Sequence, residues 1–122
     1  MTISPIGPTL AAAGLASGTA RLPLVEPRPG VRALGRVTEE AILAGVVVGF
    51  RGAAAELVRE LAREAELEDA PVVLTGGARE FLLVPAPFVS RPIEVVPELV
   101  HRGLLAALLP RLAPSDPGVR PR

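Results

Sequence analysis

The chain has 122 residues, 49% hydrophobic but only 2% aromatic, which predicts one domain with an aliphatic core. Thirteen basic residues balance thirteen acidic ones, which argues against a nucleic-acid or membrane-surface partner. The absence of cysteine excludes disulfides and thiolate chemistry, and the single histidine argues against a zinc site. No signal-peptide pattern is visible, and the longest apolar run, residues 41–50, is too short to span a bilayer. We therefore expect a cytoplasmic protein.

The first third of the chain predicts one helix between irregular segments. Residues 3–9 are expected to be irregular or a short strand, because two prolines and a glycine interrupt them. Residues 10–20 are rich in alanine and predict a helix that ends near Gly18. Residues 22–34 contain three prolines and a glycine and predict a loop.

A second, longer helix is expected to start within residues 35–40, with Thr38 as its N-cap, and to run to about Leu67 with a bend near Gly49 or Gly52. Its first half is apolar nearly all round, so it should be buried on most sides. Gly45 and Gly49, four residues apart, permit close backbone approach, either by a second copy or by another part of the same chain. The second half is amphipathic, and its charge run is most simply a solvated face.

The most informative stretch is a strand at residues 71–74 that runs into Thr75-Gly76-Gly77 and a short helix at residues 78–82. Glycine lets a ligand approach the backbone, and a helix N-terminus offers free N–H groups, so this arrangement is common in nucleotide sites. It is also common as a simple turn.

The remaining residues predict a loop at 84–90, a second strand at 92–96 and a helix at 99–109. Two strands do not make a self-sufficient sheet. We therefore expect that another polypeptide supplies strands, or that two copies pack through residues 41–50.

Four short segments carry a resemblance to a known family. They are Ile3-Ser4-Pro5-Ile6-Gly7 with a helix ending in Thr19-Ala20-Arg21-Leu22-Pro23, Gly35-Arg36-Val37-Thr38 with Gly45 and Gly49, Thr75-Gly76-Gly77, and Glu98-Leu99 with Gly103-Leu104. In this order and spacing they resemble the C-terminal half of type III pantothenate kinases, relatives of sugar kinases, Hsp70 and actin. The chain departs from the family in the extra Ile6, in Val37 where asparagine is usual, and in lacking the upstream phosphate motifs and catalytic aspartate.

The resemblance implies an α/β fold: a partial C-terminal domain of the actin-like, or ribonuclease H-like, fold over residues 1–112, its sheet completed by a partner chain, followed by a flexible tail at residues 113–122. It implies one subunit of a split kinase, inactive alone, for ATP-dependent phosphorylation of pantothenate to 4′-phosphopantothenate in coenzyme A biosynthesis. The partner would be an N-terminal-half kinase subunit that carries the catalytic aspartate and mostly holds ATP, Mg²⁺ and a monovalent cation, K⁺ or NH₄⁺. A truncated or cleaved chain is the alternative origin.

The resemblance assigns roles to named residues. Thr75, Gly76 and Gly77 would line the adenosine of ATP. Thr38 would reach the pantothenate of a neighbouring active site across a dimer formed through Ala41–Phe50, with Gly35 shaping the turn. Pro5 and Gly7 would edge the phosphate and substrate cleft. No catalytic or metal-binding residue is expected in this chain. His101 and Arg79 are expected on solvated helix faces, although Arg79 could approach a phosphate.

Two other functions fit the same sequence. A chain without the catalytic motifs could be a non-catalytic interaction module, like relatives of these kinases that act as transcription accessories. It could also be an actin-like fragment that binds another sugar or nucleotide.

Overall fold

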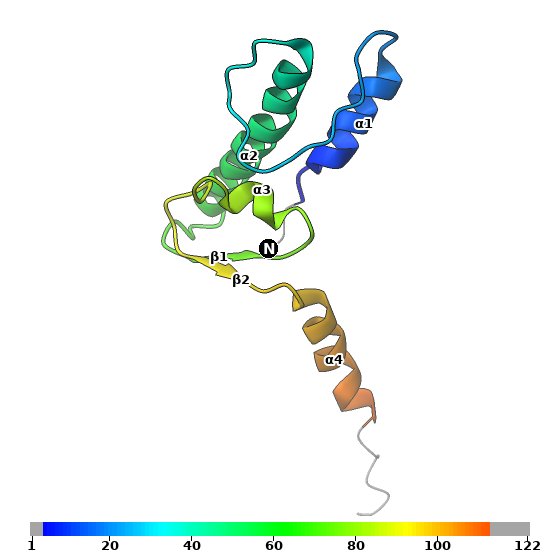
Figure 1. Cartoon of the computed structure of the whole chain (residues 1–122). Helices are drawn as coiled ribbons and strands as arrows, with labels where there is room; N and C mark the ends of the chain where they lie inside the picture. Colours follow the sequence, from blue (N-terminus) through cyan, green and yellow to red (C-terminus); the bar gives the residue numbers. More distant parts are fainter. Residues whose placement is uncertain (1–3, 113–122) are drawn as a thin grey trace, which may run out of the picture.

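A computed structural model describes residues 4–112 and the side chains of residues 4–109. The elements follow one another as α1 (Pro8–Gly18), α2 (Thr38–Glu64), β1 (Val72–Leu74), α3 (Arg79–Leu83), β2 (Ile93–Val95) and α4 (Leu99–Leu112). In Figure 1, α1 lies beside α2, the two strands and α3 lie near the other end of α2, and α4 projects away from them. The fold is therefore a small α/β unit, as predicted. The possible strand at Ile3 and the tail at 113–122 fall outside the described residues.

Helix α1 starts two residues earlier than predicted, because Pro8 takes the first helical position, where a missing N–H costs nothing. The long segment between α1 and α2 is a loop, as expected. Thr38 is not the cap of α2. It is the first helical residue, and Val37 occupies the N-cap position without a side-chain hydrogen bond. The helix start is stabilised instead by Glu40, whose carboxylate accepts a hydrogen bond from the Arg36 backbone N–H at 2.7 Å.

Helix α2 runs 27 residues without interruption through Gly49 and Gly52 and ends at Glu64, three residues before the predicted end. Glu66, with φ of 56°, turns the chain away. By length and composition alone, α2 is long and apolar enough to cross a membrane. The apolar run at residues 41–50, which by itself is too short to do so, is only part of this helix. Core helices of soluble proteins meet the same criterion, and eight α2 residues are buried here.

Two apolar clusters of buried residues line α2. The first joins α1, the following loop and the N-terminal half of α2 through Ala12, Val25, Ile42, Leu43, Val46 and Val47. The second joins α2 to β1 and α3 through Phe50, Ala54, Leu74 and Leu82. The rings of Phe50 and Phe81 meet edge to face at 6.4 Å. The apolar character of the first half of α2 is thus explained mainly by contacts within the chain.

Strands β1 and β2 form a two-stranded parallel sheet in which Val72, Val73 and Leu74 pair with Ile93, Glu94 and Val95. Helix α3 and a proline-rich loop make the crossover between them. This is the minimal strand–helix–strand unit, and within residues 4–112 no third strand accompanies it. A pair of short strands is marginal in isolation, so the packing of Leu74 and Leu82 against α2 is what holds the sheet in place.

Candidate functional site

A cavity of about 500 Å³ opens where β1 ends. One wall is the Thr75-Gly76-Gly77 turn and the start of α3. The facing wall is the segment before α1, with Ser4, Pro5 and Gly7. The structure therefore brings together two segments that are about seventy residues apart in sequence and that were both predicted to belong to a ligand site.

The turn itself requires glycine at one position. Gly76 has φ of 94°, a conformation that residues with a Cβ rarely adopt. A Cβ placed at Gly76 or Gly77 would meet no atom within 4 Å, so the space beside this backbone is open. Thr75 Oγ1 donates to the Pro97 carbonyl at 3.3 Å, and Arg79 Nη1 donates to the Gly76 carbonyl at 2.9 Å. The turn is thus fixed from both sides while its open face borders the cavity.

The floor of the cavity is apolar. Phe50, Ala54 and Val58 of α2 line it together with Leu82 and Phe88. A flat, largely apolar ring suits such a floor, and the glycine backbone offers polar groups at its edge. This chemistry fits a nucleoside better than it fits a charged group.

Pro5 and Gly7 lie at this cavity, as the resemblance implied for a cleft edge. Gly7 is the N-cap residue of α1 with φ of −65°, and its carbonyl accepts a hydrogen bond from the Ala11 N–H at 3.0 Å. Its role here therefore does not depend on a glycine-only backbone conformation. The extra residue, Ile6, has a side chain that is 69% exposed. It lines a neighbouring groove on the α2 surface instead of this cavity.

Gly35 and Thr38 lie elsewhere, at the N-terminal end of α2. Gly35 packs directly on the helix: a Cβ there would be 2.4 Å from the Ala41 backbone nitrogen. Thr38 is exposed. It precedes Phe50 by about three turns of helix, roughly 18 Å at 1.5 Å per residue. One copy of the described chain therefore does not bring Thr38 to the cavity beside the glycine turn.

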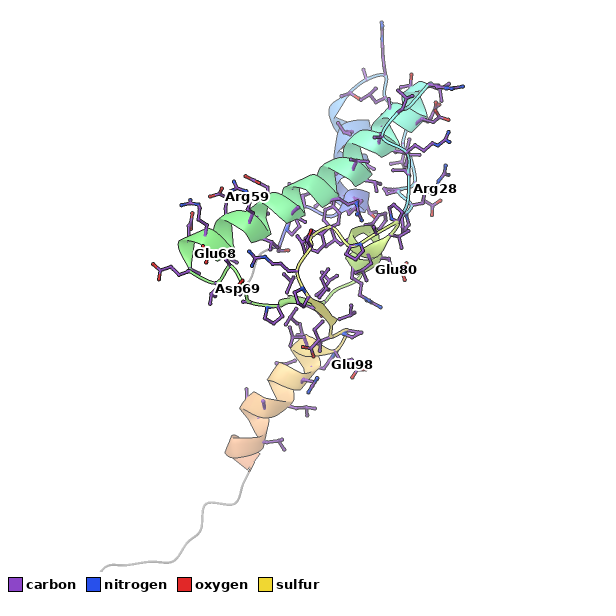
Figure 2. The ribbon with its side chains drawn as sticks, turned by 90° about the vertical axis from the view of Figure 1, so that its left-hand side faces the viewer. Arg28, Arg59, Glu68, Asp69, Glu80 and Glu98 are labelled. Carbon is purple, nitrogen blue, oxygen red and sulfur yellow. The ribbon has the colours of Figure 1, made fainter. Side chains whose placement is uncertain are left out.

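Next to Gly35 and Thr38 lies a second cavity of about 780 Å³, lined by Arg28, Arg32, Arg36, Glu40 and apolar residues of the loop. Figure 2 shows Arg28 beside this end of α2, away from Glu68 and Asp69, which follow the other end. Within residues 4–109 these three arginines form no ion pair.

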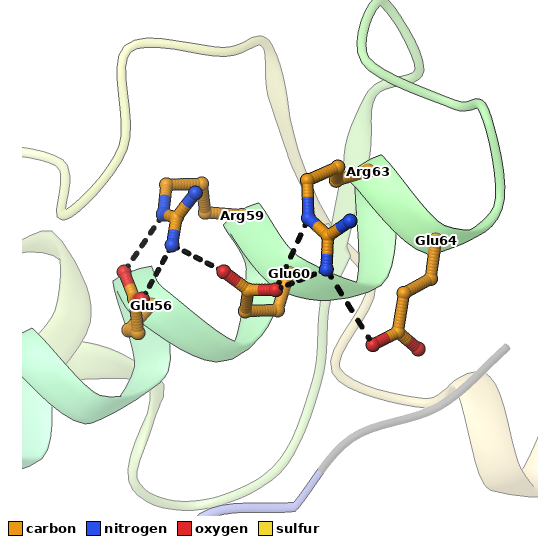
Figure 3. A network of polar contacts seen from close by, with 5 residues as sticks. All are labelled: Glu56, Arg59, Glu60, Arg63 and Glu64. Atoms are coloured by element: carbon orange, nitrogen blue, oxygen red, sulfur yellow. Dashed lines mark hydrogen bonds and ion pairs between the residues drawn. The ribbon is translucent and has the colours of Figure 1, made fainter.

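The acidic residues of α2 form a surface network with arginines, shown in Figure 3. Arg59 donates to Glu56 at 2.6 Å and also contacts Glu60, and Arg63 donates to Glu60 at 2.8 Å. The hydrogen bond from Arg59 lowers the pKa of the Glu56 carboxyl, and the hydrogen bond from Arg63 lowers that of Glu60. These side chains are exposed, which confirms the prediction of a solvated face. Within the described residues no group of three acidic or histidine side chains is placed to hold a metal ion.

Sequence reasoning missed Arg51. Its guanidinium donates to three carbonyls at the end of α3 and the following loop: Phe81 and Ala86 at 2.7 Å each and Val84 at 2.9 Å. The available signal was a lone arginine within the otherwise apolar middle of α2, ahead of a proline-rich loop. Arg79, expected on a solvated face, is half-buried and bonded to the turn, whereas His101 is exposed on α4, as expected.

Comparisons with known proteins find sequence similarity to one family. The family model described as type III pantothenate kinase matches residues 2–60. A type III pantothenate kinase of Thermus thermophilus is 38% identical over 107 residues, covering 87% of this chain and 40% of the relative. Enzymes of the same name from Akkermansia muciniphila and Thermomicrobium roseum are each 36% identical over 104 residues, covering 84% and 83% of this chain and 41% and 38% of their own lengths. The chain thus spans about 40% of the length of these curated relatives.

Proposed function

We propose that this chain, which belongs by partial homology to the type III pantothenate kinase family, forms the adenosine-binding side of a kinase whose remaining residues come from another polypeptide. In this proposal the assembly phosphorylates pantothenate to 4′-phosphopantothenate with ATP in the cytoplasm. The chain alone is inactive.

The observation that carries the proposal is the cavity beside the glycine turn. Its apolar floor suits the adenine ring, and the backbone of Gly76 and Gly77 leaves room for the ribose. The Ser4–Gly7 segment faces the turn across the cavity, where the phosphate chain of a bound nucleotide would leave the adenosine pocket. Thr75 lines the same cavity and is proposed to contact the adenosine, and its hydroxyl donates to the Pro97 carbonyl.

In the proposed complex, ATP would supply the transferred phosphoryl group and Mg²⁺ would help neutralise its charge, together with the monovalent cation that the resemblance implies. The described residues contain no suitable group of acids for these ions, so we assign the ion ligands and the catalytic aspartate to the partner polypeptide. We further propose that residues 1–112 act as one partial actin-like domain, that residues 113–122 are a tail outside it, and that partner strands extend the two-stranded sheet.

Thr38 is proposed to act in the active site of a neighbouring copy. It is exposed at the start of α2 and far from its own cavity, so a contribution to pantothenate binding requires a second copy. The exposed Gly45 and Gly49 face a groove of about 590 Å³ on α2, with nothing within 4 Å of an added Cβ at either. This leaves the glycine face open for close packing of that copy within Ala41–Phe50.

The experiment is to express the chain alone and together with the polypeptide of the adjacent reading frame. Phosphorylation of pantothenate is then measured with ATP, Mg²⁺ and K⁺. Turnover only in the co-purified complex is expected. Turnover by the 122-residue chain alone contradicts the proposal that the catalytic aspartate comes from another polypeptide. The absence of both a stable complex and turnover favours the non-catalytic interaction module instead.

A matched pair of variants tests the cavity within the active complex. A Cβ added at Gly77 would meet nothing within 4 Å, so the side chain of Gly77→Val is expected to occupy the open space beside the turn and to weaken ATP binding by about tenfold, or about 1.4 kcal/mol. Gly14→Val adds the same side chain to an open position on α1 and should leave ATP binding unchanged. Equal ATP affinities for the two variants, measured by calorimetry, would place the nucleotide elsewhere.

A further inference from the structure

Helix α4 is the one element of the described chain without extensive packing against another element. It leaves β2 and projects from the body in both views (Figures 1 and 2). None of its described side chains is buried. Val100 is 65% exposed, Leu105 58% and Leu109 63%.

The sequence of α4 does not suit an exposed helix. Among residues 99–109 only His101 and Arg102 are polar, and together they cover a small part of the helix circumference. A helix that is apolar nearly all round is buried on most sides in its working state. A helix of 14 residues is also marginal in water without packing. The covering partner must therefore offer a groove instead of a flat face.

The comparisons indicate what covers it. A match that spans 87% of this chain includes the first half of α4 wherever the match begins, so α4 belongs to the part shared with the Thermus thermophilus relative. That relative carries the larger share of its own length outside the match. The polypeptide available to bury an apolar helix in the relative, and missing from this chain, is this remaining kinase portion.

We propose that α4 is the docking helix of this chain, inserted into an apolar groove on the kinase polypeptide that the chain lacks. The proposal rests on the proposed function, because it takes that polypeptide as the partner. Beyond the proposed function, the α4 proposal names the helix that contacts the partner and the mode of binding, which is a helix in a groove.

The position of α4 relative to the cavity gives this docking a consequence. Leu99, the first residue of α4, lines the cavity beside the glycine turn. Thr75 of the turn is hydrogen bonded to Pro97, two residues before α4. A partner that binds α4 therefore lies at the edge of the proposed nucleotide cavity, where residues that contact the phosphates are needed.

The test uses the complementary part of the Thermus thermophilus relative, meaning its residues outside the match, as the binding partner. Leu104→Asp is compared with Leu24→Asp, in which another exposed leucine, in the loop after α1, is changed; Leu24 is 72% exposed and Leu104 56%. Leu104→Met serves as the conservative variant. Circular dichroism of each isolated chain checks that the fold is retained, which is expected because Leu104 makes no buried contact. Affinity is measured by calorimetry and turnover by the pantothenate assay.

The Leu104→Asp variant is expected to lose at least about tenfold in affinity, as for a well-buried interface residue, while Leu24→Asp and Leu104→Met bind like the unchanged chain. Equal binding by Leu104→Asp, in a complex that still turns over, overturns the α4 proposal and leaves the proposed function intact. No complex with the unchanged chain overturns the α4 proposal and removes support for the split kinase as well. Two other outcomes also overturn the α4 proposal. If the chain self-associates and Leu104→Asp abolishes this, α4 binds a second copy. If the chain binds phosphatidylglycerol vesicles through Leu104 and does not bind the kinase portion, α4 binds lipid.

Discussion

Replacing Gly35 by alanine should destabilise the chain, although the residue lies in a loop and its φ is not in the left-handed region. A Cβ at this position would be 2.4 Å from the Ala41 backbone nitrogen, 2.7 Å from the Glu40 carbonyl carbon and 2.8 Å from the Ala41 Cα. All three are backbone atoms of the first turn of α2, so no side-chain rotation relieves the clash. The loop must move away from the helix by several tenths of an ångström.

The size of the effect follows from two opposing contributions. Forced backbone shifts of this kind typically cost about 1–3 kcal/mol. The lower entropy of the unfolded alanine variant returns about 0.4–1 kcal/mol of that. The difference between these two ranges is a net loss of roughly 0–2.6 kcal/mol, centred near about 1.3 kcal/mol, and each kcal/mol lowers the Tm of a domain this small by roughly 4–8 °C. The shift should also disturb the hydrogen bond from the Arg36 N–H to Glu40.

The matched control is Gly49→Ala. It makes the same chemical change inside α2, where an added Cβ meets nothing within 4 Å. Alanine favours a helix interior over glycine by about 0.5–1 kcal/mol, so this variant should be more stable than the unchanged chain. Urea unfolding followed by circular dichroism, at a concentration at which the chain is monomeric, measures both. Equal stability of the two variants, or a Gly35→Ala midpoint no lower than that of the unchanged chain, would refute the close approach of the loop to α2.

Three further outcomes are expected. Gly76→Ala should cost about 1–3 kcal/mol because φ at Gly76 is 94°, whereas Gly77→Ala, which has no such constraint, should unfold at nearly the same urea concentration as the unchanged chain. Arg51→Met should lower stability by about 1–3 kcal/mol by leaving three carbonyls without their charged donor, and Arg28→Met, whose side chain forms no ion pair with a described residue, should not. The folded-state pKa values of Glu56 and Glu60 lie below their ordinary value of 4.5, so their contribution to stability is present above about that pH and is lost as the pH falls through the lower folded values. Thermal unfolding between about pH 6 and pH 3 should show a weaker pH dependence for Arg59→Gln, and an unchanged profile would contradict the network.

The elements that could be predicted from the sequence were those with strong local signals. Prolines and glycines fixed the loop after α1, and the apolar run of Pro71–Leu74 followed by two glycines indicated β1 and its turn, which the structure confirms. The charge run in the second half of α2 predicted a solvated face, and the Glu56–Arg59 and Glu60–Arg63 pairs lie on the surface of that half. Each of these depends only on residues near one another in sequence.

What the sequence did not reveal depends on contacts between distant segments. Thr38 was expected to cap α2, but the loop approaches the helix at Gly35 and places Val37 at the cap position instead. The Arg51 contacts with the loop beyond α3 involve residues about thirty positions apart, for which no local pattern exists. The meeting of the Ser4–Gly7 segment with the glycine turn is likewise a tertiary fact, and the family resemblance was the only earlier indication of it.

Both apolar clusters contain buried residues of α2. We therefore expect this chain to fold before it assembles with a partner, with α1 and the loop packed on one end of α2 and the strand–helix–strand unit packed on the other. A partner then binds a chain that has already folded, and its binding is not needed to complete either apolar cluster. The rate of assembly should consequently rise in proportion to partner concentration, without a plateau imposed by slow folding of this chain.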